Sequence, residues 1–174
     1  MNEIKIITAE TDDLDLINSL LYDTALWIKE KGSTQWAGLL KGEDVHGVSS
    51  AIERNEVHLV YLNSELVGTL ALWDKQTDWD SDLWGENDSR EFYYLHRIAV
   101  EKNQHGKDRG KLLIDAAKRL CKSNGKKGIR LDCIASKPYL NNFYEANGFH
   151  FVKTIYNYDN GEGLQDYNLY QIFF

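Results

Sequence analysis

Apolar residues recur with two different periods along this chain, and these periods predict where its strands and helices lie. Alternating or continuous apolar runs, rich in β-branched and aromatic residues, predict strands at residues 3–8, 57–62, 66–73, 92–100, 129–134, 149–155 and 167–173. Apolar residues three or four positions apart predict helices at residues 14–31, 43–54, 112–120 and 138–146. The order is βααββ, then βαβα, then ββ, which predicts a mixed α/β fold.

Glycines and polar clusters mark the connections between these elements. A polar turn at residues 63–65 makes the second and third strands an antiparallel hairpin, and Gly32 and Gly148 follow predicted helices. Longer loops are predicted at residues 33–38, 74–91 and 158–165. The chain shows no internal repeat.

Composition places the chain among ordinary globular proteins. The 174 residues include one proline, 43% hydrophobic and 27% charged residues, which favours a single domain over residues 1–174. No apolar run approaches the roughly 20 residues of a membrane span. Residues 1–5 lack the anatomy of a signal peptide, so a cytoplasmic location without a membrane partner is expected.

The net charge and the cysteines narrow the classes of ligand. A formal charge of −7 disfavours general nucleic-acid binding, which needs a basic face, and is compatible with a cationic substrate. Cys121 and Cys133 lie on a predicted helix and a predicted strand, without the paired spacing of metal or redox motifs. Both are therefore expected to be reduced core thiols, and no metal is expected.

Residues 92–111 combine a strand, a basic turn that contains glycine, and the start of a helix. Unpaired backbone N–H groups and the helix dipole converge at such a turn, so an anion such as phosphate is favoured there. Two glycines in a surface loop, here Gly106 and Gly110, are also ordinary turn chemistry. From these residues alone, both interpretations stay open.

Three segments together resemble the GNAT superfamily, the Gcn5-related N-acetyltransferases. They are LHRIAV at residues 95–100, HGKDRG at residues 105–110 and NFYEANGF at residues 142–149. The resemblance implies a mostly antiparallel twisted sheet with a central splayed strand and flanking helices. It also implies transfer of an acetyl group from acetyl-CoA to a primary amine of a small molecule, peptide or protein, by direct attack through a tetrahedral intermediate.

Several positions depart from the pattern of that superfamily. Its pyrophosphate motif, Gln or Arg, two residues, Gly, one residue, then Gly or Ala, has His105 at its first position and Asp108 in place of its middle glycine. A carboxylate beside a pyrophosphate is unfavourable unless it points outward or caps the helix. Lys137 stands where many members carry Asn. These departures motivate an alternative function, a non-catalytic acyl-CoA-binding regulatory module.

The resemblance assigns the cofactor site to backbone groups of the central strand and to the loop that follows it. The strand would bind the pantetheine arm, and the loop amides would bind the pyrophosphate with help from basic side chains. The implied residues are Ile98, Ala99 and Val100; His105, Gly106, Lys107, Asp108, Arg109, Gly110 and Lys111; and Lys137 and Asn141.

Three residues are candidates for catalysis. Tyr144 matches the family tyrosine that protonates the departing thiolate, and a phenol with an unperturbed pKa of about 10 keeps its proton at neutral pH. A core tyrosine with one satisfied hydroxyl is the alternative. His96 occupies a strand position where some members carry a histidine, and it could relay the proton from the amine. Glu91, at the entrance of the strand, is the second candidate for this base.

Aromatic residues are the candidates for binding the acceptor. Regular alternation puts Tyr94, His96 and Ile98 on one face of the strand, so Tyr94 would face the acceptor if Ile98 lies at the cofactor. Trp27 and Trp36 could line the same pocket, although core packing is the more common role of a tryptophan.

The acidic residues at 74–91 surround Trp79 and Trp84. They form either a solvated loop or a lip that attracts a cationic amine through charge and aromatic faces. The expected partner is therefore an amine, with a cationic one favoured. The terminal strand at residues 167–173 could also pair across a homodimer.

Overall fold

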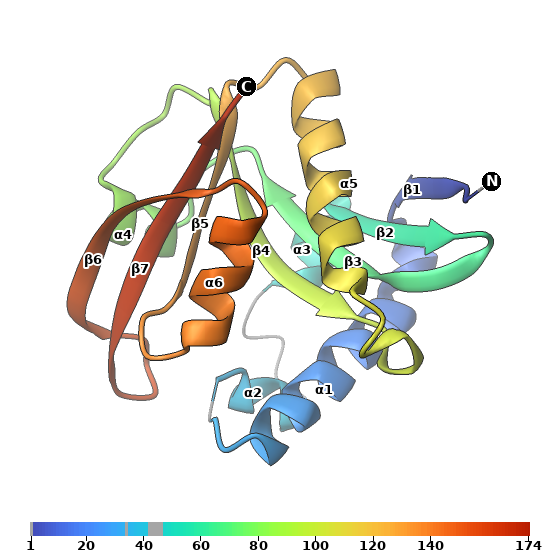
Figure 1. The fold of residues 1–174 in the computed structure, drawn as a ribbon, viewed down its shortest axis with the longest axis horizontal. Coiled ribbons are helices and arrows are strands. Elements are labelled where there is room, and N and C mark those ends of the chain that lie inside the picture. Colours follow the sequence, from blue (N-terminus) through green and yellow to red (C-terminus); the bar gives the residue numbers. More distant parts are fainter. Residues whose placement is uncertain (1, 34, 42–46) are drawn as a thin grey trace. The chain divides into compact units, whose positions relative to one another are not determined.

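The computed structural model describes residues 2–33, 35–41 and 47–174 (Figure 1). Packing separates the chain into two compact units. The first comprises Met1–Leu72 with His96–Ala117, and the second comprises Trp73–Leu95 with Lys118–Phe174. Strand β4 (Phe92–Val100) and helix α5 (Arg109–Ser123) each run from one unit into the other. Within the part of the chain described, no helix is long and apolar enough to cross a membrane.

The first unit begins with an antiparallel arrangement of strands. Its strand order is β1-β2-β3-β4, and β2 pairs antiparallel with both β1 and β3. Helix α1 buries a stripe of apolar residues at helical spacing, as the sequence predicts. Besides parts of β4 and α5, the elements are β1 (Ile4–Thr8), η1 (Thr11–Asp13), α1 (Leu14–Glu30), α2 (Ala37–Leu40), α3 (Val48–Glu53), β2 (Val57–Leu62), β3 (Glu65–Trp73) and η2 (Lys102–Gln104).

Strand β3 comes unusually close to β4 at Gly68. A Cβ atom on Gly68 would lie 2.2 Å from the carbonyl oxygen of Ala99, so no larger residue fits without moving backbone. Val67, the residue before Gly68, accepts a hydrogen bond of 2.8 Å at its carbonyl from the Glu101 amide. The backbone around Ala99 is therefore positioned by direct contact between two main chains.

The second unit has the strand order β4-β5-β7-β6. Strand β7 pairs antiparallel with β5 and β6, whereas β4 and β5 run parallel. The parallel register covers only Phe92–Tyr94 and Gly128–Arg130, as expected for a strand that splays from its neighbour. Besides parts of β4 and α5, the elements are α4 (Asp78–Trp84), β5 (Gly128–Ile134), α6 (Pro138–Ala146), β6 (His150–Asp159) and β7 (Leu164–Phe173).

Strand β5 lies between two helices of the second unit. The Cys133 thiol lies 3.5 Å from the side-chain oxygen of Asn141 on α6, while Asp132 accepts a hydrogen bond from Trp79 on α4. Because adjacent side chains of a strand point to opposite faces, α6 and α4 cover opposite faces of β5. Figure 1 shows α6 in front of β5 and β7 and α4 behind them. The predicted mixed fold with a mostly antiparallel sheet is confirmed.

Three predicted connections are wrong. The loop at residues 74–91 contains α4, which begins with reciprocal hydrogen bonds between Thr77 and Asp80. The loop at residues 33–38 ends in α2. The turn at residues 158–165 is shorter than predicted, because β6 and β7 pair as far as Asp159 and Leu164.

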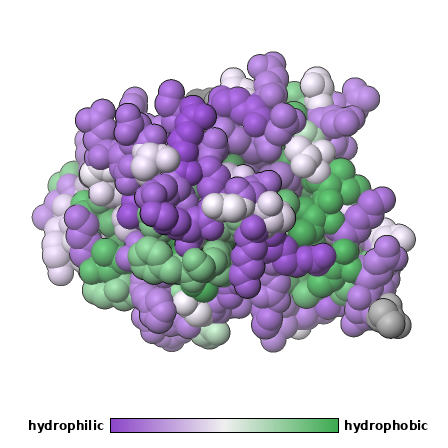
Figure 2. Space-filling model, turned by 90° about the horizontal axis from the view of Figure 1, so that it is seen from above, coloured by the Kyte–Doolittle hydropathy of each residue, from purple (hydrophilic) through white to green (hydrophobic). Residues whose placement is uncertain are grey.

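The structure also bears on the predicted helix at residues 43–54 and on the state of the two cysteines. The predicted helix at residues 43–54 is present as α3 over its second half, while residues 43–46 lie outside the described residues. The two cysteines, Cys121 and Cys133, are free and buried, as predicted. The face drawn in Figure 2 is mainly hydrophilic, with hydrophobic side chains in separate patches.

Candidate active site

The loop before α5 is built from residues with left-handed backbone conformations. Gly106 has a φ of 76° and Asp108 a φ of 59°. Asp108 therefore adopts the conformation that the middle glycine of the pyrophosphate motif would adopt freely, and aspartate is one of the few residues that tolerate it. Helix α5 begins at Arg109, so Arg109, Gly110 and Lys111 form its first turn and not the loop.

The first turn of α5 leaves backbone amides without partners inside the helix. Arg109 donates from Nε to Gln104 Oε1 at 3.1 Å, and the Lys111 ammonium lies 2.6 Å from Asp115. Lys107 is exposed. Exposed loop backbone, helix-start amides and three cations make this segment suitable for an anionic phosphate, with the Asp108 carboxylate as the opposing charge.

His105 folds back onto the end of β4. Its Nε2 lies 3.0 Å from the Val100 carbonyl oxygen, and its ring meets the Trp27 ring edge-on at 5.5 Å. The structure therefore brings Trp27, predicted to bind the acceptor, onto a residue of the predicted pyrophosphate loop. Trp36 is half-buried, with a φ of 64° just before α2.

The regular alternation assumed for β4 is interrupted at Arg97, which has a φ of 51°. A shared face for Tyr94, His96 and Ile98 therefore does not follow from the strand period. Tyr94 is only 4% exposed. Its hydroxyl accepts hydrogen bonds from Gln76 at 2.9 Å and from Arg130 at 3.2 Å. His96, Ile98 and Val100 are half-buried, and Ala99 is buried.

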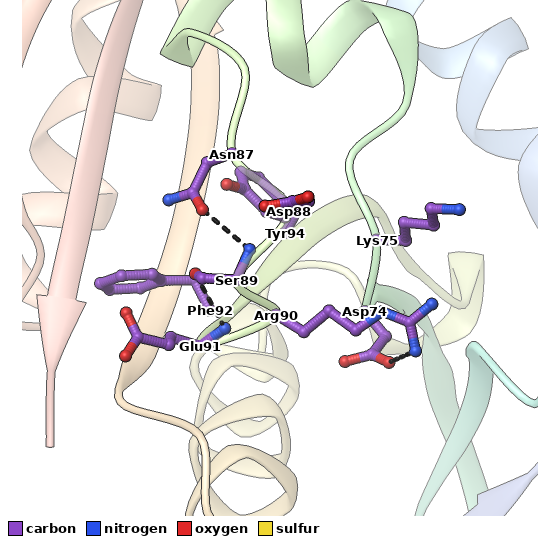
Figure 3. A pocket seen from close by; sticks show the side chains of 9 residues that line it. All are labelled: Asp74, Lys75, Asn87, Asp88, Ser89, Arg90, Glu91, Phe92 and Tyr94. Carbon is purple, nitrogen blue, oxygen red and sulfur yellow. Dashed lines mark hydrogen bonds and ion pairs between the residues drawn. The ribbon is translucent and has the colours of Figure 1, made fainter.

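Glu91 is less suited to be a base than the sequence suggests. The carboxylate of Glu91 forms an ion pair with Lys127. The hydrogen bond within this pair is the main cause that lowers the pKa of Glu91. A carboxylate with a lowered pKa has less affinity for a proton. Glu91 also lines a small surface hollow (Figure 3). In this hollow Asp74 and Arg90 point toward each other at 3.7 Å, so its charges largely compensate one another.

Tyr144 lies on α6 among other aromatic rings. The helix starts with Pro138 in its first turn, and the chain turns away at Gly148, whose φ is 92°. The Tyr144 ring packs near Phe143, Phe149 and Tyr170, with centroid separations of 5.2, 6.0 and 6.2 Å. Burial is the main cause that raises its pKa, and the nearby Cys133, Asp132 and Tyr139 add to the effect. The phenol is thus kept protonated, as a proton donor must be.

Asn141 has a structural use that the sequence does not reveal. Its Nδ2 donates to the carbonyl of Lys137 at 2.9 Å and to that of Ile134 at 3.3 Å. Its Oδ1 accepts from the Tyr170 hydroxyl at 2.7 Å and from the Asn168 amide at 2.8 Å. The side chain therefore ties α6 to β5 and β7. Lys137 precedes α6 without a side-chain capping bond.

One carboxylate near Tyr144 escaped the sequence analysis. Asp132 sits in β5, where the available signal was a second charged residue, two positions after Arg130, in a strand whose other residues are apolar. Its charge contributes to the raised pKa values of Tyr144, Tyr158 and Tyr167. Asp132 thus lies within electrostatic reach of the candidate proton donor.

Comparison with known proteins gives one consistent result. A model of the acetyltransferase (GNAT) family matches residues 24–149. YesJ of Bacillus subtilis (strain 168), an uncharacterised N-acetyltransferase, is 36% identical over 141 residues, which cover 81% of this chain and 78% of YesJ.

Solved structures of acetyltransferases are also similar to this chain. A GNAT-family acetyltransferase from Listeria monocytogenes 4b F2365 is 36% identical, with a TM-score of 0.78 over 98% of this chain and 95% of that chain. A Bacillus subtilis acetyltransferase solved in complex with CoA is 17% identical, with a TM-score of 0.64 over 100% of this chain and 99% of that chain. The second likeness concerns the fold alone.

Proposed function

The chain belongs to the GNAT family of acetyltransferases, and we propose that it transfers an acetyl group from acetyl-CoA to a primary amine of a small molecule or peptide. The observation that carries this proposal is Tyr144, a phenol whose proton is retained by burial, on the helix where the family tyrosine is expected. The CoA complex of a neighbour with the same fold supports the choice of acyl donor. Acetyl-CoA, when bound, supplies the activated acyl group as a thioester.

The proposed cofactor site uses backbone more than side chains. Amides at the start of α5 and in residues 105–108 would bind the phosphates. The exposed Lys107 ammonium would pair with their charge. Main-chain groups of Ile98, Ala99 and Val100 would align the pantetheine arm. Support for this assignment comes from the close contact at Gly68, which positions the main chain of Ala99.

Tyr144 is proposed to donate its proton to the sulfur that leaves. Negative charge develops on the sulfur as the C–S bond breaks, and a neutral phenol held close to it can neutralise that charge by donating its proton. The phenol of Tyr144 is neutral at physiological pH, as a donor must be, while burial, which raises its pKa, also makes it a weaker acid than a free tyrosine.

The amine must lose a proton before or during its attack, and His96 is the preferred acceptor. Glu91 is disfavoured because Lys127 lowers its pKa. With His96→Gln we expect kcat to fall about tenfold or more, and with Glu91→Gln we expect a change within about threefold. Steady-state kinetics on both variants measures this, and the reverse order of effects would assign the base to Glu91.

The activity itself is tested by incubating the protein with acetyl-CoA and a panel of amines. Thiol release that requires an amine, together with a mass increase of one acetyl group on that amine, is the expected result. Calorimetry with acetyl-CoA addresses the alternative of a regulatory module. Binding without turnover on a broad panel would favour the module, and no binding at micromolar ligand would exclude both functions.

A further inference from the structure

Gln104 is a buried polar residue directly before the loop at residues 105–108. It is 6% exposed, whereas the four residues of the loop are exposed. It ends the short turn η2, in which its backbone amide donates to the Glu101 carbonyl at 2.8 Å. A glutamine is rarely this buried unless the polar groups of its side chain have partners.

The side chain of Gln104 joins two residues of opposite charge. Its Oε1 accepts a hydrogen bond from Arg109 Nε at 3.1 Å, and its Nε2 donates to Glu65 Oε2 at 3.3 Å. A guanidinium can only donate and an ionised carboxylate can only accept, so this orientation of the amide is the one that satisfies both partners. A side chain with one donor and one acceptor at its end can connect the two charges in this way.

The hydrogen bond between Gln104 and Arg109 spans the loop. Gln104 directly precedes the loop and Arg109 directly follows it as the first residue of α5, so the two ends of the loop are tied together. The bond from Gln104 to Glu65 then ties these ends to the start of β3. The hydrogen bond between Glu101 and Val67 attaches the same turn to β3 a second time.

Burial contributes little to the conformation of residues 105–108, because all four are exposed. Gly106 and Asp108 have a positive φ, which costs free energy for an aspartate. A loop that is held at its ends loses less conformational entropy on binding a ligand, and its amides are already oriented. Fixing the ends of the loop therefore favours phosphate binding without any contact between Gln104 and the phosphates.

Resting on the acetyl-CoA binding of the proposed function, we propose that Gln104 is a positioning residue for the acyl donor. By joining Arg109 to Glu65, it holds the amides of residues 105–108 where they bind the pyrophosphate. Gln104 acts on the affinity for acetyl-CoA and not on the chemical step. It lies just outside residues 105–110, which the pyrophosphate motif covers.

The first test replaces Gln104 by a side chain of similar length without hydrogen-bonding groups of comparable strength. Gln104→Met should raise Kd for acetyl-CoA about tenfold in calorimetry and leave kcat at saturating acetyl-CoA within about twofold of wild type. Asn103→Ala, at an exposed position of the same turn, is the matched control and should change neither value. A Gln104→Met protein that is less stable but binds acetyl-CoA within about twofold of wild type would show a purely structural role and overturn the proposal.

The second test exchanges the end groups of Gln104 and Glu65. Gln104→Glu places a second carboxylate against Glu65 and should weaken acetyl-CoA binding by about tenfold or more. In the double variant Glu65→Gln/Gln104→Glu, the carboxylate at position 104 accepts from Arg109 and from the amide at position 65, and the net charge is that of wild type.

The double variant should bind acetyl-CoA within about threefold of wild type. If it binds as weakly as Gln104→Glu alone, the charge at position 104 and not the chain of hydrogen bonds sets the affinity, and the inference fails. Because the double variant keeps the polar groups of wild type, it decides the question even where Gln104→Met does not fold.

Calorimetry also separates this inference from the proposed function. If wild type binds acetyl-CoA more tightly than Gln104→Met does but acetylates no amine, the inference stands and the proposed transfer falls. If amines are acetylated and Gln104→Met binds acetyl-CoA as wild type does, only the inference falls. A wild-type protein that does not bind acetyl-CoA would overturn both.

Discussion

Helix α6 and the loop at residues 105–108 both belong to segments that resemble the same family, yet they use their residues in opposite ways. In α6, individual side chains make specific contacts: Asn141 makes several internal hydrogen bonds, and Tyr144 packs among aromatic rings. In the loop, the backbone conformation matters most, with Gly106 and Asp108 exposed and at positive φ.

The difference explains why the loop departs from the motif and α6 does not. A site made of backbone amides accepts any residue that can adopt the required φ, and aspartate is one of these. A buried amide with several partners accepts no substitute without cost, since its loss leaves several polar groups unsatisfied. The weaker match at Asp108 and the stronger match around Tyr144 therefore have a common physical explanation, which three sets of variants can test.

The largest effect is expected at Tyr144. Tyr144→Phe should lower kcat by at least about 10²-fold with little change in KM for acetyl-CoA, because the proton donor is lost while the ring is kept. Burial raises the pKa of Tyr144, so the wild-type phenol should stay protonated from pH 7 to about 10 and the deficit should be constant over that range. Stopped-assay rates across this range measure it.

Tyr139→Phe is the matched control, since Tyr139 lies on the same helix and is 62% exposed. It should behave like wild type. Equal rates for Tyr144→Phe and wild type at every pH would remove the assignment of Tyr144 as the acid and, with it, the contrast between the two regions.

The next effect concerns stability. Asn141→Ala should lower the free energy of unfolding by about 2–4 kcal/mol, because the Tyr170 hydroxyl, the Asn168 amide and two carbonyls lose a partner in a buried place. Asn142→Ala, at the exposed neighbouring position, should change it by less than about 0.5 kcal/mol. Urea unfolding followed by circular dichroism compares the two. Similar values for both variants would show that α6 does not depend on this network.

The smallest effect is expected in the loop, where charge and backbone can be separated. Asp108→Asn removes the charge and Asp108→Gly removes both the charge and the cost of a positive φ. If the carboxylate faces the phosphates, both variants should bind acetyl-CoA about three- to tenfold more tightly. Only the glycine variant should also raise the free energy of unfolding, by about 1 kcal/mol. Unchanged affinity in calorimetry would show that Asp108 points away from the ligand.

Periodicity predicts most strands of this chain well because β2, β3, β4, β5 and β7 bury apolar residues. The same reasoning overlooks α4, since DWDSDLW offers few apolar residues to a helical stripe. A signal was present in Thr77 and Asp80, whose spacing is that of a capping box. The positive φ of Arg97 cannot be predicted from the sequence, because arginine is not among the residues that favour this backbone conformation.

The residues of the candidate site, like the helices and strands, could be predicted from the sequence only in part. Tyr144 is found from its motif, but Asn141 and Asn142 are equivalent in sequence, and only the packing of α6 on β5 shows which one is buried. Asp132 was overlooked because a single charge in a strand says nothing about what faces it. Its hydrogen bond from Trp79 comes from α4, a helix that the sequence pattern did not reveal.

The close contact between Gly68 and Ala99 has a consequence for directed evolution of this enzyme. A library randomised at Gly68 and selected for activity should return glycine almost alone, whatever acceptor is used in the selection. A library randomised at Asp108 should return several residues, with asparagine and glycine among them. Engineers who wish to change the acceptor can therefore leave Gly68 untouched and use their sequence diversity elsewhere.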